Sequence, residues 1–144
     1  MKTILTLALL ALTPLAHAHG DKHKVAGPNG GRVVATVEPH FEFLVTPERK
    51  IKLTFLTDDN KLTAPSQQSV TAIGGDRVAP TRFNFTRESD VLVSDKPLPE
   101  GNEIPIVLQI KVTPNAKTVT TRFTINLAQC PTCEHAEYAC TCEH

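Results

Sequence analysis

Four cysteines gathered near the end of the chain are the residues best suited to chemistry. Residues 130–144 read CPTCEHAEYACTCEH, in which a close cysteine pair followed by Glu-His occurs twice. The CxxC loop can place two sulfurs on one ion, and the CxC pair can add two more after a chain reversal. Thiolates select soft or borderline metals, so the spacing predicts a Zn or Cu site. The expected ligands are Cys130, Cys133, Cys140 and Cys142, with His135 and His144 as supplementary ligands.

The first residues of the chain have the pattern of a cleavable export signal. Lys2 precedes an apolar run over residues 4–12, and Pro14 stands before the small-residue cleavage site Ala16-His17-Ala18. The run is shorter than the roughly 20 residues that a membrane-spanning helix needs. We therefore expect a periplasmic protein that is not integral to the membrane, with secretion as the alternative. The expected segments are a signal peptide (1–18), a flexible His-containing arm (19–31), a β-domain (32–127) and a Cys/His-rich tail (128–144).

Export also favours a competing interpretation of the cysteines, because oxidising compartments promote disulfide bonds. Four cysteines allow three connectivities, and a bridge inside CxC is strained, so Cys130 or Cys133 would pair with Cys140 or Cys142. The neighbouring histidines favour metal binding, since a disulfide needs no imidazole. A thioredoxin-type dithiol is a third interpretation, but its motif belongs in a βαβ setting. Metal site and disulfides both stay open on the sequence.

Three further histidines are weaker candidates for metal ligands. Cleavage after Ala18 makes His19 the new amino terminus, where the α-amine and the imidazole can chelate Cu(II) together. His23 lies four residues further along the expected arm, and His40 follows a Glu-Pro turn. Histidines beside a cleavage site or in a turn are also commonly solvated. His40 could serve a site only if the arm or the tail folds back onto the domain.

Apolar residues alternate with polar ones through the expected domain, which predicts β-strands. The alternation is clearest over residues 41–45 and 51–55, which predict a hairpin, and over 104–112 and 119–127, which predict a second. No helical period runs for three turns between residues 32 and 127, and eleven prolines disfavour long helices. We expect an all-β fold, a single immunoglobulin-like antiparallel β-sandwich of seven or eight strands, with a small barrel as the alternative.

Composition and motifs argue against several classes of function. Lys and Arg total 15 and Asp and Glu total 15, without a block of like charge, so neither nucleic acid nor an anionic membrane surface is an expected partner. No hydrolase, metalloprotease, phosphate-loop or dinucleotide signature is present. We therefore expect a protein without catalytic activity. The sequence leaves the oligomeric state open.

Three segments resemble a known group of proteins. GPNGGRVV (27–34), HFEFLVTPERKIKLTFLTDDNK (40–61) and LPEGNEIPIVLQIKV (98–112) are similar to small bacterial periplasmic β-sandwich proteins associated with heavy-metal (copper or zinc) efflux and resistance systems. The resemblance implies metal homeostasis as the function and a metal-efflux component as a partner. Those proteins often bind metal through Met and His on the sandwich. Met1 is the only methionine here, so the tail must supply the ligands.

Overall fold

The structure, a computed structural model, describes residues 26–142 of the 144-residue chain. The expected leader and three candidate ligands (His19, His23 and His144) lie outside the described residues. Strands dominate the described part, as the alternation predicts. They are β1 (Arg32–Val34), β2 (His40–Val45), β3 (Lys50–Leu56), β4 (Leu62–Thr63), β5 (Ser69–Gly74), β6 (Thr81–Glu88), β7 (Val91–Pro97), β8 (Glu103–Lys111) and β9 (Val119–Asn126), followed by the short 3-10 helix η1 (Glu137–Ala139).

The two hairpins predicted from the sequence are both present. In the first, β2 pairs antiparallel with β3, and Phe41 lies opposite Phe55. Its turn uses Arg49 at a φ of 61°, a left-handed conformation that closes the reversal. In the second, β8 pairs with β9 along eight residue pairs, with Ile106 opposite Phe123. Alternation therefore predicted which strands pair and which side chains share a face.

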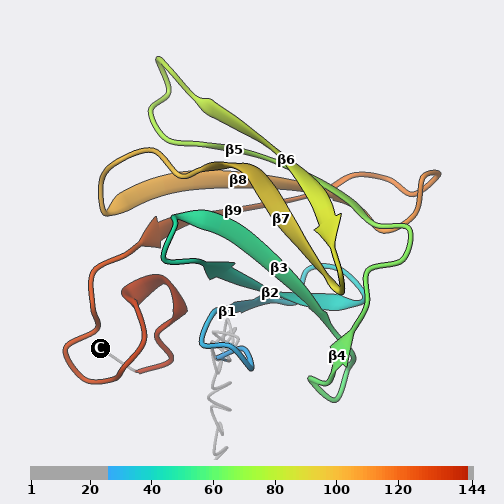
Figure 1. The fold of residues 1–144 in the computed structure, drawn as a ribbon, viewed down its shortest axis with the longest axis horizontal. Helices are drawn as coiled ribbons and strands as arrows, with labels where there is room; N and C mark the ends of the chain where they lie inside the picture. Colours follow the sequence, from blue (N-terminus) through green and yellow to red (C-terminus); the bar gives the residue numbers. More distant parts are fainter. Residues whose placement is uncertain (1–25, 143–144) are drawn as a thin grey trace, which may run out of the picture.

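All strands belong to one antiparallel sheet with the order β1-β2-β3-β7-β6-β5-β8-β9, while β4 pairs with β3 at the side (Figure 1). The predicted all-β antiparallel class is confirmed. The finer prediction of an immunoglobulin-like sandwich is not confirmed. The reason is that β6 pairs with β7 through its second half and with β5 through its first half, so it joins both halves into one sheet. The continuous sheet curls into a half-barrel.

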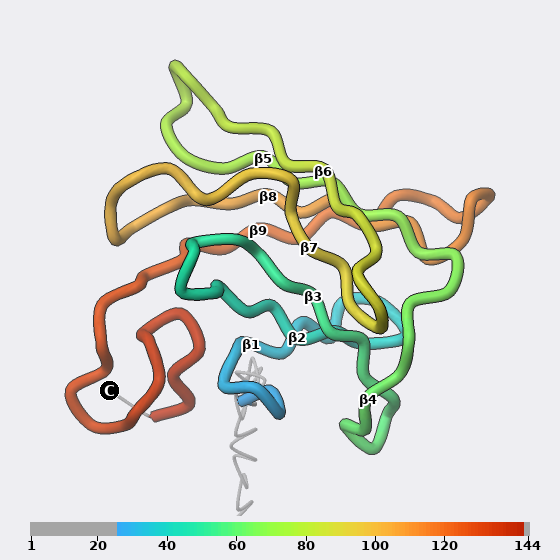
Figure 2. Tube along the Cα trace, viewed as in Figure 1, coloured from blue at the N-terminus to red at the C-terminus, as the bar shows by residue number. Residues whose placement is uncertain are grey.

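The inner face of the half-barrel carries the hydrophobic core. Phe41, Phe43 and Phe55 are fully buried there, together with the inward residues of β8. Burying each such aromatic side chain contributes roughly 2–3 kcal/mol. The sheet leaves an open seam between its edge strands β1 and β9, and η1 contacts both of them. The Cα trace shows the C-terminal loop beside β1 at this seam (Figure 2). Among the described residues, no helix is long and apolar enough to cross a bilayer.

Candidate metal centre

The chain after β9 folds into an ordered loop, which we call the cysteine loop (residues 128–142). Backbone pairing closes its base, since the N–H of Glu137 donates to Ala128 O (2.9 Å) and that of Cys130 donates to His135 O (3.0 Å). The Gln129 side-chain amide also donates to Cys133 O at 2.9 Å. This pairing reverses the chain within CPTCEH, and η1 then directs the chain back towards the start of the cysteine loop. Local hydrogen bonds therefore fix the positions of the cysteines.

Four sulfur atoms converge inside this loop. The Sγ atoms of Cys130, Cys133, Cys140 and Cys142 all lie within 4.8 Å of one another. Cys140 Sγ lies 3.3 Å from Cys130 Sγ and 3.7 Å from Cys133 Sγ, and all four residues are free thiols. Tetrahedral Zn–S bonds of about 2.3 Å separate neighbouring sulfurs by roughly 3.8 Å. The observed separations fit four ligands to one ion with only small adjustments.

Burial divides the four cysteines into two pairs. Cys130 and Cys140 are buried, with exposures of 3% and 2%, whereas Cys133 and Cys142 are half-buried. Each buried sulfur sits behind a half-buried one on the same short segment of chain. An ion held by this set would be anchored from the inside and reachable from the outside. Four protein ligands would fill the coordination sphere of Zn(II), so an incoming ligand would have to displace one of the half-buried thiolates.

The thiols have strongly different acidities because they share one small space. The Thr132 hydroxyl, 3.2 Å away, and the Thr132 backbone lower the pKa of Cys130 to about 5. Burial raises the pKa of Cys140 to about 12, and neighbouring Cys130 adds to this effect. The His135 backbone N–H favours the Cys133 thiolate, but burial and Cys130 outweigh it and the pKa of Cys133 rises. Cys130 therefore loses its proton easily and Cys133 and Cys140 lose theirs reluctantly, and a bound cation would favour the thiolate form of both.

Tyr138 attaches the cysteine loop to the half-barrel. It lies in η1, is 6% exposed, and stacks edge-on against Phe43 with ring centroids 6.1 Å apart. Its hydroxyl accepts a hydrogen bond from the Val45 N–H at 2.9 Å. Burial raises the pKa of this phenol, and the charge of Glu42 adds to the rise, so the hydroxyl stays protonated at neutral pH. One aromatic side chain thus joins the sulfur cluster to the core.

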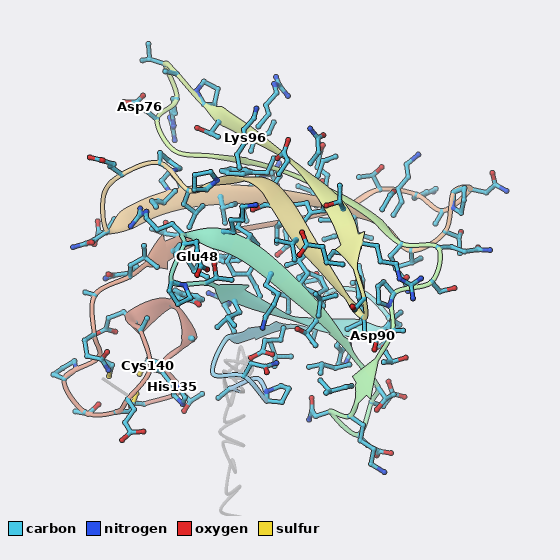
Figure 3. All side chains as sticks on the ribbon, in the orientation of Figure 1. Glu48, Asp76, Asp90, Lys96, His135 and Cys140 are labelled. Atoms are coloured by element: carbon cyan, nitrogen blue, oxygen red, sulfur yellow. The ribbon has the colours of Figure 1, made fainter. Side chains whose placement is uncertain are left out.

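A second ordered segment, the glycine-rich loop (residues 26–31), lies next to the cysteine loop. It folds over β2, where the fully buried Glu42 accepts the backbone N–H groups of Asn29 (2.9 Å) and Gly31 (2.7 Å). The Asn29 side-chain amide donates to the same carboxylate at 2.6 Å. The ring of His135 lies close to Gly30. Figure 3 shows His135 and Cys140 together at this side of the molecule.

The structure places the predicted histidine ligands differently from the cysteines. His135 is in the cysteine loop, but its ring lies against Gly30 and it is not one of the four residues whose ligand atoms converge. His40 lies elsewhere, and its Nδ1 is 3.0 Å from Val37 O and 3.2 Å from a Glu38 carboxylate oxygen. Glu38, His40 and Asp58 form a separate, largely exposed group with ligand atoms within 4.8 Å.

Sequence reasoning missed two residues that build the site. Alternation along β2 places Glu42 on the face opposite Phe41 and Phe43, which is commonly solvated, but the glycine-rich loop covers it. Tyr138 stands between the two cysteine pairs without any periodic signal. The run Gly-Pro-Asn-Gly-Gly was a usable sign, because such loops expose consecutive N–H groups that bind an anion.

No family model, curated protein or solved structure gives a significant match to the chain. The relation to periplasmic proteins of metal-efflux systems therefore stays a prediction.

Proposed function

We propose that this protein binds one thiophilic metal ion through Cys130, Cys133, Cys140 and Cys142, and that it buffers or hands over Zn or Cu. The convergence of the four sulfur atoms within 4.8 Å carries the proposal. Four thiolates suit both Zn(II) and Cu(I), since both ions accept tetrahedral or lower coordination by sulfur. His135 and His144 are supplementary candidates.

Transfer rather than permanent retention follows from the burial of the ligands. The outer cysteines, Cys133 and Cys142, are half-buried, so an acceptor's ligand can reach the ion from that side. The leader predicted over residues 1–18 would bring this chemistry to the periplasm, where a metal-efflux component is the proposed partner. Nothing in the proposal requires catalysis, because ligand exchange alone moves the ion.

The test uses the full chain without its leader, reduced and loaded with Zn(II) or with Cu(I). Native mass spectrometry should detect one retained ion per chain, and Cys130→Ser or Cys140→Ser should abolish retention. Thr141→Ala is the matched control, because Thr141 is exposed and lies between two of the ligands. Wild-type protein that retains neither metal, or a Cys130→Ser variant that retains it fully, would refute the proposal.

A second candidate function is a non-catalytic interaction module whose C-terminal loop is closed by two disulfides. The 3.3 Å approach of Cys140 Sγ to Cys130 Sγ favours this candidate, because small movements would bring the pair to bonding distance. Counting thiols on freshly isolated protein separates the two. Four reactive thiols after metal removal support the metal site, and none supports the disulfide module. Thiols that appear only after mild reduction would indicate a loop whose metal is lost on oxidation.

A further inference from the structure

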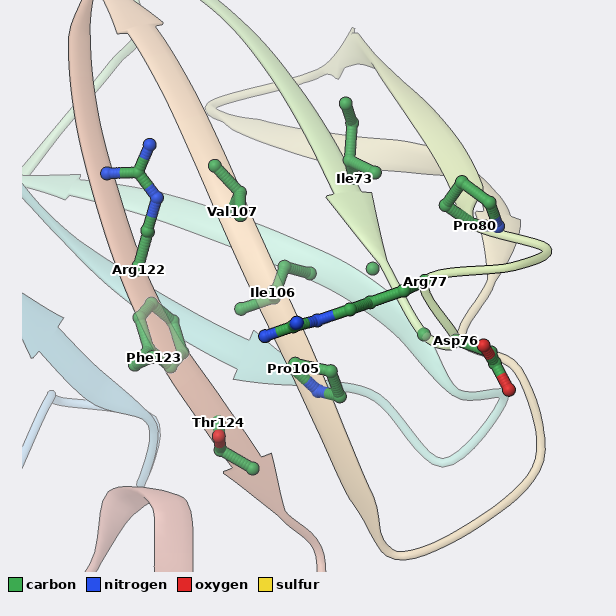
Figure 4. Close-up of a pocket in the computed structure, with 12 residues that line it drawn as sticks. Ile73, Asp76, Arg77, Pro80, Pro105, Ile106, Val107, Arg122, Phe123 and Thr124 are labelled. Carbon is green, nitrogen blue, oxygen red and sulfur yellow. The ribbon is translucent and has the colours of Figure 1, made fainter.

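A pocket of about 440 Å³ lies on the half-barrel at the outer surface of β5, β8 and β9 (Figure 4). Its size falls within the range of small-molecule sites. None of the four cysteines lines it. The pocket is therefore separate from the candidate metal centre, and whatever it binds is not explained by metal transfer.

Strand register gives this pocket an apolar floor. Ile73 of β5 lies opposite Val107 of β8, and Val107 lies opposite Arg122 of β9, so these three side chains share the outer face. Pro105 lies two residues along β8 on the same face, opposite Thr124. The opposite face of β8 is packed into the core through Ile104, Ile106 and Leu108. The floor is thus a patch of apolar side chains left on the outer surface.

Two arginines border this floor. Arg77 reaches from the loop between β5 and β6 across β8, and Arg122 stands on β9 beside Val107 (Figure 4). Within residues 26–142, neither guanidinium forms an ion pair or a hydrogen bond with another residue. By contrast, Arg32 covers the Phe123 ring, and Arg49 donates to the carbonyl groups of Pro99 and Gly101.

The single carboxylate beside the pocket does not neutralise these charges. Asp76 Oδ1 accepts the Val78 N–H at 2.8 Å, a bond that shapes the loop carrying Arg77. Val78 itself is 93% exposed in this loop. The result is an apolar floor with two free cationic groups above it. A guanidinium fork matches a carboxylate in charge and in geometry, so the pocket suits an anion that carries an apolar body.

We propose that this pocket binds a small organic carboxylate whose apolar chain lies on Ile73, Val107 and Pro105. Its carboxylate is held by Arg77, and Arg122 adds a second positive charge at the border of the floor. The floor removes apolar ligand surface from water, and the two arginines select the anionic head group. An inorganic anion would contact the arginines but not the apolar floor. An uncharged ligand would contact the floor without using the charge of the arginines.

In the experiment, ¹⁵N-labelled protein with its metal bound is titrated with octanoate. The amide chemical shifts are followed during the titration. Octanol and octylamine serve as uncharged and cationic ligands of matched length. Octanoate should produce saturable shifts in β5, β8 and β9, and should bind about tenfold more tightly than octanol. Arg77→Gln should weaken octanoate binding by a similar factor, Arg122→Gln should weaken it less, and both should leave octanol binding unchanged.

Arg87→Gln is the matched control, because Arg87 is exposed on β6 and does not line the pocket. Its octanoate affinity should equal that of wild type. A variant of the floor, Val107→Glu, should abolish octanoate binding because its carboxylate stands on the apolar floor, opposite Arg122. Equal binding of octanoate and octanol, shifts that lie mainly outside these three strands and the loop 75–80, or equal losses in all three arginine variants would overturn the proposal.

Discussion

The glycine-rich loop and the cysteine loop lie side by side, yet they are organised by opposite arrangements of charge. In the glycine-rich loop, one buried carboxylate, Glu42, accepts hydrogen bonds from three N–H groups, so its charge has partners within the fold. In the cysteine loop, four sulfur atoms face one another, and as thiolates they would repel. The first arrangement is complete without a ligand. The second becomes favourable when a cation binds, which is why we assign function to the cysteine loop.

Among the expected effects on stability, the largest is at Glu42. Glu42→Ala should lower the free energy of unfolding by about 4 kcal/mol, because it leaves three donors without their acceptor in a buried place. The measurement is urea unfolding of metal-loaded protein, with Glu88→Ala on exposed β6 as the control. Metal stoichiometry at low temperature should stay at one ion per chain. A variant that unfolds normally but loses its metal would show that the two loops form a single site.

Metal removal should produce the next largest effect. With free metal at a hundredfold excess over Kd, chelation should lower the free energy of unfolding by about 3 kcal/mol. Because η1 contacts both β1 and β9, hydrogen exchange should accelerate at these two edge strands more than at β3 or β7. Thr141→Ala should respond to chelation like wild type. Faster exchange that is uniform over the sheet would mean that the cysteine loop does not secure the seam.

The sequence predicted local structure well because alternation reports which side chains share a face. It predicted both hairpins and the four cysteines of the candidate centre. It did not predict the half-barrel. Whether two halves of a sheet separate or stay joined depends on β6, whose two ends pair with different strands. That choice is made by tertiary packing and leaves no period in the sequence.

The same reasoning explains why the roles of individual residues near the centre were only partly predicted. Spacing identified Cys130, Cys133, Cys140 and Cys142 because metal ligands must be close in the chain or brought close by a reversal. It gave no sign of Glu42, because the loop that covers this carboxylate comes from a segment expected to be a flexible arm. Spacing also could not predict whether the His135 ring faces the sulfur atoms, because the orientation of the ring depends on contacts such as the one with Gly30.

A double mutant sharpens the account of the glycine-rich loop. A Cβ added at Gly27 would overlap the Glu42 side chain, so Gly27→Ala should cost about 2 kcal/mol of stability in wild type. In the Glu42→Ala background the obstacle is gone, and the same substitution should cost almost nothing. The coupling energy from chemical unfolding of the four proteins is therefore expected to be close to 2 kcal/mol. Additive effects would mean that Gly27 is required for another reason.

The smallest effect concerns the bond that joins the cysteine loop to the sheet. Tyr138→Phe should cost about 1 kcal/mol at pH 8, because the Val45 N–H loses its acceptor. Burial raises the pKa of Tyr138 in the folded state above its ordinary value of about 10. The folded state therefore holds this proton more tightly than the unfolded state does.

It follows that the hydroxyl's contribution is complete below pH 10 and is lost as the pH rises through the folded pKa. The stability difference between wild type and Tyr138→Phe should accordingly shrink when unfolding is measured at pH 11 instead of pH 8. Other groups titrate in both proteins and cancel in this difference. A difference that stays constant would show that the buried hydroxyl ionises as freely in the folded protein as in water, and a difference near zero at both pH values would show that the loop is held by ring packing against Phe43 alone.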